Sequence, residues 1–152
     1  MNGSVTEHIE ATPDAVWALV SDITRTGEFS PETFEAEWLG GATEPDVGVK
    51  FRGHVLRNGR PPAYWTVCRI TSCEPGRVFA FDVLGPGDRV MNSWRYELEP
   101  SGSGTDVTES FRLPANLPTK AYWALFGRAR GKTNERGMRE TLGRIRAVAE
   151  SP

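Results

Sequence analysis

The sequence contains few of the residues that build most catalytic and metal centres. Among its 152 residues there are only two histidines and two cysteines. His8 and His54 both fall at positions that we assign below to the outer face of a sheet. Neither has a nucleophile or a group of metal ligands beside it at a suitable spacing. We therefore expect no metal site and no bound cofactor.

The chain also lacks a long hydrophobic run. No stretch approaches the roughly 18 consecutive apolar residues that a membrane helix needs. The opening residues MNGSVTEHIEA have neither a basic start nor an apolar core. With 38% hydrophobic and 25% charged residues, the composition is that of a globular protein. We expect a cytoplasmic protein with no transmembrane segment and a single domain over residues 1–152, of undefined oligomeric state.

The two cysteines do not favour a disulfide. Cys68 and Cys73 lie five positions apart in what reads as one strand, and an odd spacing points their side chains to opposite faces. A bond between them is geometrically unfavourable, so we expect two reduced structural thiols.

A nucleotide-binding loop is absent as well. The stretch FGRARGKTN, residues 126–134, resembles one, but only three residues separate its first glycine from the Gly-Lys pair. A phosphate loop has four residues there and follows a strand, and no glycine-rich strand-to-helix turn of the dinucleotide-binding kind occurs elsewhere. We interpret Gly127, Gly131 and Gly137 as positions where a helix bends or admits a close neighbour.

Charge is unevenly distributed along the chain. The net charge is −2, yet residues 119–152 carry eight Lys and Arg against three Glu. Such a segment is most often the solvated face of a helix lying on an acidic body, so we expect no nucleic-acid partner. One alternative is a protein-interaction module that uses the basic positions Arg128, Lys132, Arg136, Arg139 and Arg146.

The first forty residues predict a strand, two short helical segments and a second strand. Thr12, Pro13 and Asp14 form a helix start, with a capping hydroxyl, a proline in the first turn and an acid at the positive end of the helix dipole. The predicted helices span 13–22 and 23–31. The predicted strands are 5–11, with Val5, Glu7 and Ile9 on one face, and 34–41, with Phe34, Ala36 and Trp38 on one face.

Three turn signals then predict an antiparallel meander over residues 47–113. They are RNGR at 57–60, EPGR at 74–77 and SGSG at 101–104. The first turn places Phe51 opposite Thr66 and Gly53 opposite Tyr64. The second places Phe79 opposite Ser72, Phe81 opposite Ile70 and Val83 opposite Cys68. The third places Trp94 opposite Phe111, Tyr96 opposite Glu109 and Leu98 opposite Val107.

These registers sort the meander into an apolar face and a wet face. The apolar face holds Phe51, Val55, Tyr64, Thr66, Cys68, Ile70, Ser72, Phe79, Phe81, Val83, Trp94, Tyr96, Leu98, Val107, Glu109 and Phe111. The wet face holds Arg52, His54, Trp65, Arg69, Asp82, Arg95 and Arg112, with Trp65 stacked under Arg52. A large apolar face requires a cover. A long helix from Pro118 onward provides it, with an inward stripe of Trp123, Phe126, Arg130, Asn134, Gly137, Met138, Thr141, Ile145 and Val148.

This order of elements resembles the START-like, helix-grip superfamily (SRPBCC), and in particular its small bacterial members. The superfamily includes the birch-pollen allergen, lipid-transfer domains, and bacterial polyketide cyclases, dehydrases and aromatases. The stretches that carry the resemblance are IEATPDAVWALVSDI, VGVKFRGHV, ITSCEPGRVFAFDV and NERGMRETLGRI. It covers essentially the whole chain. It implies an α+β fold in which a curved antiparallel sheet of about seven strands (β-α-α-β6-α) grips a long C-terminal helix around an internal cavity.

The resemblance also implies a ligand in that cavity. An aromatic lining suits a flat hydrophobic molecule held by stacking and shape. The candidate ligand-binding residues are Trp38, Phe51, Tyr64, Phe81, Trp94, Tyr96, Glu109, Phe111, Trp123, Phe126, Arg130, Asn134 and Met138. The alternative is that these rings fill the core, which is the most typical role for Phe79 and Phe81.

Polar residues on the apolar face are the candidate catalytic residues. Glu109 lies directly across from Tyr96, and Glu7 lies between Val5 and Ile9. Burial raises the pKa of a carboxyl group toward the range that is useful for general acid or base catalysis. Alternatively, Glu109 is hydrated near the cavity mouth, or has a structural bond to Tyr96 or Arg130.

Three functions follow from these observations. The one that we favour is a non-catalytic carrier or sensor that binds a small hydrophobic molecule, lipid or polyketide-like. The second is a polyketide cyclase, aromatase or dehydratase in which Glu109 or Glu7 moves protons and Tyr96 holds a carbonyl oxygen. The third is the protein-interaction module described above.

Overall fold

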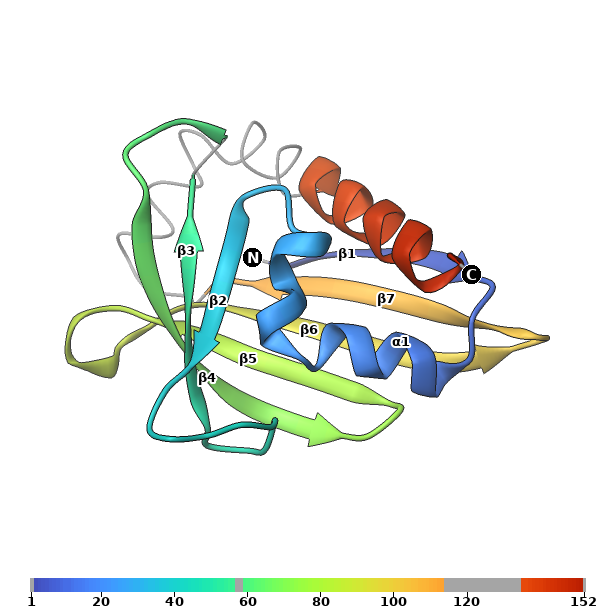
Figure 1. Cartoon of the computed structure of the whole chain (residues 1–152), viewed down its shortest axis with the longest axis horizontal. Coiled ribbons are helices and arrows are strands. Elements are labelled where there is room, and N and C mark those ends of the chain that lie inside the picture. The colour runs from blue at the N-terminus through green and yellow to red at the C-terminus, as the bar shows by residue number, and fades with distance from the viewer. Residues whose placement is uncertain (1, 57–58, 114–134, 152) are drawn as a thin grey trace.

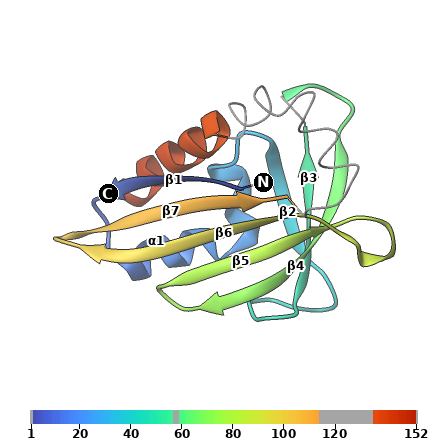
Figure 2. The same ribbon diagram turned by 180° about the vertical axis from the view of Figure 1, so that it is seen from behind.

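The protein folds as one curved sheet of seven antiparallel strands, with its helices on one face. The computed structural model describes residues 2–56, 59–113 and 135–151. The strand order across the sheet is β1-β7-β6-β5-β4-β3-β2. Figures 1 and 2 show α1, η1 and the C-terminal helix on the same side of this sheet. The elements are β1 (Asn2–Ile9), α1 (Pro13–Val20), η1 (Ile23–Glu28), β2 (Thr33–Trp38), β3 (Lys50–Val55), β4 (Tyr64–Glu74), β5 (Val78–Leu84), η3 (Pro86–Asp88), β6 (Val90–Ser101), β7 (Gly104–Arg112) and the C-terminal helix (135–149).

Helix α1 begins where the sequence predicts. The Thr12 side chain accepts a hydrogen bond from the backbone N–H of Ala15, and Pro13 occupies the first turn. Val16, Leu19 and Val20 form its buried face. The Trp17 ring also meets Phe79 edge-on, at 6.0 Å between ring centroids, which helps to hold α1 against the sheet.

The register of β6 and β7 confirms the third predicted turn. Trp94 pairs with Phe111, Tyr96 with Glu109 and Leu98 with Val107. Gly102 occupies the turn with a φ of +61°, which glycine adopts without strain. Tyr96 and Glu109 are therefore held opposite each other by the backbone itself.

The second predicted register is only partly correct. Ile70 pairs with Phe81 and Cys68 with Val83 as expected, but a bulge between Ile70 and Ser72 places Phe79 opposite Cys73. The extra residue reverses the alternation of side chains, so Cys73 packs against the hydrophobic core instead of facing outward. The prediction that the two cysteines face opposite ways is wrong, and both are free thiols.

The first hairpin differs from the prediction by two positions. Phe51 pairs with Cys68 and Gly53 with Thr66, because the strands end at Val55 and Tyr64 and leave a connection longer than two residues. Side chains alternate with a period of two, so a shift of two positions keeps every predicted inward residue inward. The error therefore leaves the predicted composition of the inner face of β3 and β4 unchanged.

Strand β2 contains a second irregularity. The register shifts between Thr33 and Glu35, and the Phe34 ring lies against His54 on the outer face. Phe34 is 45% exposed. The prediction that Phe34 faces inward with Ala36 and Trp38 is wrong, because the bulge turns Thr33 inward in its place.

The described part of the C-terminal helix covers the inner face of the sheet. Met138, Leu142 and Ile145 are almost completely buried there and join the core cluster. Four predicted inward residues, Trp123, Phe126, Arg130 and Asn134, lie outside the described residues. No helix in the described ranges is long and apolar enough to cross a membrane.

The outer face of the sheet carries a stacked group of side chains. The Arg52 guanidinium lies 4.2 Å from the centre of the Trp65 ring, as predicted. His54 stacks on the same Trp65 at 4.2 Å between ring centroids. These contacts lie on the side opposite the core, so they do not take part in forming the cavity.

Candidate functional site

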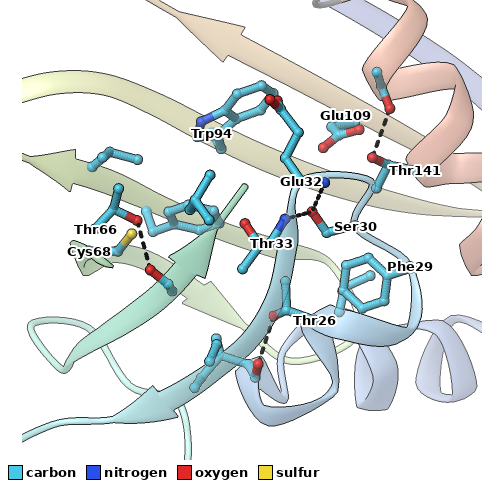
Figure 3. A pocket seen from close by; sticks show the side chains of 18 of the residues that line it. Thr26, Phe29, Ser30, Glu32, Thr33, Thr66, Cys68, Trp94, Glu109 and Thr141 are labelled. Atoms are coloured by element: carbon cyan, nitrogen blue, oxygen red, sulfur yellow. Dashed lines mark hydrogen bonds between the residues drawn. The ribbon is translucent and has the colours of Figure 1, made fainter. Parts of the chain in front are cut away.

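A cavity of about 240 Å³ lies between the sheet and the helices that cover it. Its walls come from the inner face of β3 to β7, from the end of α1 and η1 with the segment that leads into β2, and from the C-terminal helix. Figure 3 shows Glu109 and Thr141 at one end, Thr66 and Cys68 at the other, and Thr33 between them. The curvature of the sheet thus leaves space that the helices do not fill.

Seven predicted ligand-binding residues line this cavity. They are Phe51, Tyr64, Phe81, Trp94, Tyr96, Glu109 and Met138. Tyr64 is 41% exposed and Tyr96 only 6%, so the cavity runs from a solvent-accessible end to a dry one.

Two predicted residues contact lining residues but do not line the cavity themselves. Trp38 packs edge-on against Phe51, at 6.3 Å between ring centroids. Phe111 packs against Trp94 at 5.7 Å. Both share the inward parity of the lining residues and contact a lining ring, but neither is part of the lining.

Sequence reasoning missed the contribution of the stretch that runs from η1 to the first residue of β2. Thr26, Phe29, Ser30, Glu32 and Thr33 all line the cavity. The Ser30 hydroxyl accepts hydrogen bonds from the backbone N–H groups of Glu32 and Thr33, at 3.3 and 2.9 Å, which shapes the entry into β2 (Figure 3). The signal in the sequence was a helical turn that ends near a proline, but period-two alternation assigns no face to such a segment.

Two further residues line the cavity although the sequence did not assign them to it. Phe79, expected as plain core, lines the cavity as well. Gly137, expected as a place where the helix bends or admits a neighbour, also lines it, and a Cβ atom added there would meet nothing within 4 Å. The side of the helix at Gly137 is therefore open to the cavity.

The dry end of the cavity contains a buried hydrogen-bonded pair. The Tyr96 hydroxyl donates to Oε2 of Glu109 at 2.8 Å, and the Glu109 residue is only 4% exposed. Burial raises the pKa of the Glu109 carboxyl group to about 8, although the hydrogen bond from Tyr96 acts in the opposite direction. Burial and the neighbouring carboxyl group raise the pKa of Tyr96 well above its ordinary value. The pair is therefore mostly neutral near pH 7.

One oxygen of this pair stands out. Oε1 of Glu109 is fully buried, and among the described residues it has no hydrogen-bond partner. An unpaired buried polar atom is costly, and in native proteins it usually has a reason such as a bound molecule.

Two hydroxyl groups of the lining contrast with Glu109 because they bond within their own helical segments. Thr141 donates to the carbonyl oxygen of Gly137 at 2.8 Å, and Thr26 donates to that of Ile23 at 2.7 Å. These bonds occupy the donors locally. Among the described residues, Oε1 of Glu109 is thus the fully buried side-chain polar atom that has no hydrogen-bond partner.

The second predicted carboxyl group lies elsewhere. Glu7 points to the same side of the sheet as Val5 and Ile9, but it is not part of the cavity lining. Its carboxylate lies 3.6 Å from the Arg139 guanidinium, with about a third of its side chain exposed. The structure therefore brings Glu109 and Tyr96 together and leaves Glu7 apart from them.

The basic face of the C-terminal helix is largely paired within its described part. Arg139 contacts Glu135, and Arg146 contacts Glu150, at 3.1 Å each. Arg128 and Lys132 lie outside the described residues. Arg136 is exposed and has no ion pair among the described residues. The two paired arginines offer an acidic protein less than the sequence predicted, whereas Arg136 stays accessible.

Comparisons with known proteins support the resemblance. The family model for polyketide cyclase / dehydrase and lipid transport matches residues 2–150. No curated protein matches the chain.

Solved structures share the fold. A START superfamily protein from Mycobacterium smegmatis aligns with a TM-score of 0.76 at 14% identity, over 98% of this chain and 97% of that one. A protein from Nitrosomonas europaea aligns with a TM-score of 0.72 at 11% identity, over 97% and 93%. A Polyketide_cyc-like protein from Corynebacterium glutamicum is 30% identical, with a TM-score of 0.54, over 98% and 85%.

The family match therefore extends over nearly the whole length of the sheet and helices described above. The chain belongs to the polyketide cyclase / dehydrase and lipid transport family, and it has the START-like helix-grip fold.

Proposed function

We propose that the protein binds or carries a small hydrophobic molecule, lipid or polyketide-like, in the cavity between its sheet and its helices. The observation that supports this proposal most strongly is the cavity itself. Its volume of about 240 Å³ is at the small end for a ligand pocket. Aromatic and aliphatic side chains make up more than half of its walls, and hydroxyl and carboxyl groups make up much of the rest. A mainly apolar lining with some polar groups is the usual composition of a site for an apolar ligand that carries a polar group.

The arrangement of rings supports a flat ligand. Phe51 meets Phe81 edge-on at 5.2 Å between ring centroids, and Phe81 lies 5.9 Å from Phe79. Three rings from two strands, Phe51 on β3 with Phe79 and Phe81 on β5, thus form a continuous wall. A planar apolar molecule can bury its faces against such a wall without requiring hydrogen bonds.

Catalysis by a cyclase or dehydrase is a second candidate, and one observation favours it. The pKa of Glu109, at about 8, suits transfer of a proton near neutral pH. An acid–base reaction of this kind also needs a second positioned group. Among the described residues, Tyr96 is the titratable group bonded to Glu109, and its pKa is raised well above the ordinary value. We therefore place binding ahead of catalysis.

Two glycines of the C-terminal helix allow a matched test. Gly137 lines the cavity, whereas Gly143 is exposed, and a Cβ atom added at either position meets nothing within 4 Å. We expect Gly137→Leu to fill the cavity and to weaken binding of the fluorescent apolar probe N-phenylnaphthylamine by about tenfold or more, a change of roughly 1.4 kcal/mol. Gly143→Leu should bind the probe like the original protein.

Both substitutions remove a glycine from a helix interior, which favours the helix by up to about 1 kcal/mol in each case. Thermal unfolding of the two variants checks that both remain folded. If Gly137→Leu remained folded and bound the probe as tightly as Gly143→Leu, the cavity would not be the binding site and the proposal would fail.

A further inference from the structure

The strongest unexplained feature is the unpartnered oxygen of Glu109 at the dry end of the cavity. We infer that the ligand is a neutral molecule whose carbonyl oxygen accepts a hydrogen bond from Oε1 of Glu109, while its flat apolar body lies along the aromatic wall. This inference rests on the proposed function and adds the polar chemistry of the ligand to it.

The direction of the hydrogen bond between Tyr96 and Glu109 determines whether Oε1 of Glu109 can act as a donor to a ligand. The Tyr96 hydroxyl donates to Oε2, so Oε2 acts as the acceptor of the carboxyl group. With Oε2 as the acceptor, we assign the proton of the neutral carboxyl group to Oε1. That O–H is buried and unpaired among the described residues, and it requires an acceptor.

The surroundings of Glu109 keep its carboxyl group neutral. Tyr96 contacts it from β6, and Val5 lies opposite it on β1. From the C-terminal helix, the uncharged side chains of Met138 and Thr141 line the same cavity. Figure 3 shows Thr141 next to Glu109, across from the sheet. Burial by these groups is the largest cause of the raised pKa.

Charged groups on the neighbouring elements do not reverse the preference of Glu109 for its neutral form. The charged residues to consider are Glu7 on β1, Arg139 on the C-terminal helix and Glu32 before β2. Glu7 and Arg139 pair with each other at 3.6 Å. Glu32 also lines the cavity, and its side chain is a carboxyl group. A ligand carboxylate would have to be buried beside the carboxyl group of Glu109, so this end of the cavity disfavours acids.

The geometry of the cavity also indicates where in the ligand the carbonyl group lies. Glu109 lies at the dry end, whereas Tyr64 at the other end is 41% exposed. The rings of Phe51, Phe79 and Phe81 form the wall described above. A ligand with its carbonyl at one edge of a fused ring system satisfies both requirements.

Three probes with one skeleton test this inference: tetralin, its ketone α-tetralone and tetralin carboxylate. Dissociation constants are measured by NMR titration at pH 7. We expect α-tetralone to bind about tenfold or more tightly than tetralin, since a hydrogen bond to a buried polar group is worth roughly that factor. Tetralin carboxylate should bind more weakly than α-tetralone. The α-tetralone affinity should also fall as the pH rises past about 8, where Glu109 loses its proton.

The matched variants are Glu109→Gln and the double variant Tyr96→Phe with Glu109→Met. The glutamine keeps an N–H donor, so ketone binding should persist, without the loss at high pH. The double variant replaces both polar partners by apolar groups of similar shape, which is well tolerated in general. It should bind tetralin and α-tetralone with nearly equal affinity, and its thermal unfolding checks the fold.

The possible outcomes separate this inference from the proposed function. If the original protein bound tetralin and α-tetralone equally, or preferred tetralin carboxylate, the inference would be overturned while the binding function stood. An unchanged ketone preference in the folded double variant would also overturn it. If none of the three probes bound, both the inference and the proposed function would be wrong.

Discussion

The pKa values of carboxyl groups are shifted in opposite directions on the two sides of the sheet. On the inner face, Glu109 is buried with a neutral phenol as its partner, and its pKa is raised to about 8. On the outer side, Glu10 is exposed, and hydrogen bonds from Ser103 and His8 lower its pKa. The same side chain is thus stabilised as a neutral acid in one place and as an anion in the other.

The comparison shows that access to water, more than residue type, decides the state of each group. Outer carboxylates such as Glu35 and Glu37 contact His54 and Arg52 of the neighbouring strand. Exposed pairs of this kind contribute little to stability, because water already solvates both charges. The inner carboxyl group has no such solvation, so its protonation state must matter for both stability and binding.

The largest expected effect is on the inner face. The folded-state pKa of Glu109, about 8, lies above its ordinary value of 4.5, so the folded state holds a proton that the unfolded state releases between these two values. The contribution of Glu109 to stability is therefore greatest below pH 4.5 and is lost as the pH rises to about 8, by a total on the order of a few kcal/mol. Glu109→Gln should abolish this fall, as measured by urea unfolding at pH 4.5, 6 and 8.5.

The same experiment can contradict the comparison between the faces. At the low end of the pH range, Glu109→Gln and the original protein should have similar stability, because both side chains are then neutral. If the difference between them did not increase with pH, the inner carboxyl group would be charged and solvated like those outside.

A smaller effect is expected on the outer face. Arg52→Ala removes the contact with Trp65 and the ion pair with Glu37, and should lower the free energy of unfolding by about 0.5–1.5 kcal/mol. Arg95→Ala is the matched control. Arg95 pairs with Glu97 at 2.7 Å, and no ring lies under it among the described residues.

Chemical denaturation of these two variants isolates the cation–π contact. We expect Arg52→Ala to be the more destabilising, by about 0.5–1 kcal/mol. Equal effects would mean that the stacked arrangement on the outer face adds nothing beyond a surface ion pair.

The smallest effect is expected at His8. Hydrogen bonds to Asp106, at 2.8 Å to Nδ1, and to Glu10 raise the pKa of His8 above its ordinary value. This contribution to stability is present below pH 6.5 and is lost as the pH rises through the raised pKa. His8→Gln should therefore lower the melting temperature slightly at pH 6 and leave it unchanged at pH 9. An NMR titration of the His8 ring that gave an ordinary pKa would contradict this account.

Several features of the fold and the site could be predicted because their signals are local. The SGSG turn was enough to place Tyr96 opposite Glu109. The capping residues at Thr12 were enough to start α1. Even the wrong register of the first hairpin kept its inner face, because an error of two positions preserves parity.

Other features could not be predicted from alternation. The bulges in β2 and β4 turned Phe34 outward and Cys73 toward the core, and each shifts the pairing by a single position. The segment from Phe29 to Thr33 contributes to the cavity although it follows no helical or strand period. Bulges occur where a sheet bends around the helices packed against it. The sequence of a single strand does not specify where those helices will lie.

The sequence by itself determined the order of the elements, the apolar and wet faces of the central strands, and the pairing of Tyr96 with Glu109. It could do so because turn chemistry and period-two alternation act over only a few residues. Only the tertiary structure decided that this pair lies at the dry end of a cavity, that Glu7 pairs with Arg139 instead, and that Gly137 leaves the cavity open. The physical reason is that burial, and with it the pKa of Glu109, depends on how closely separate elements approach one another across the curved sheet.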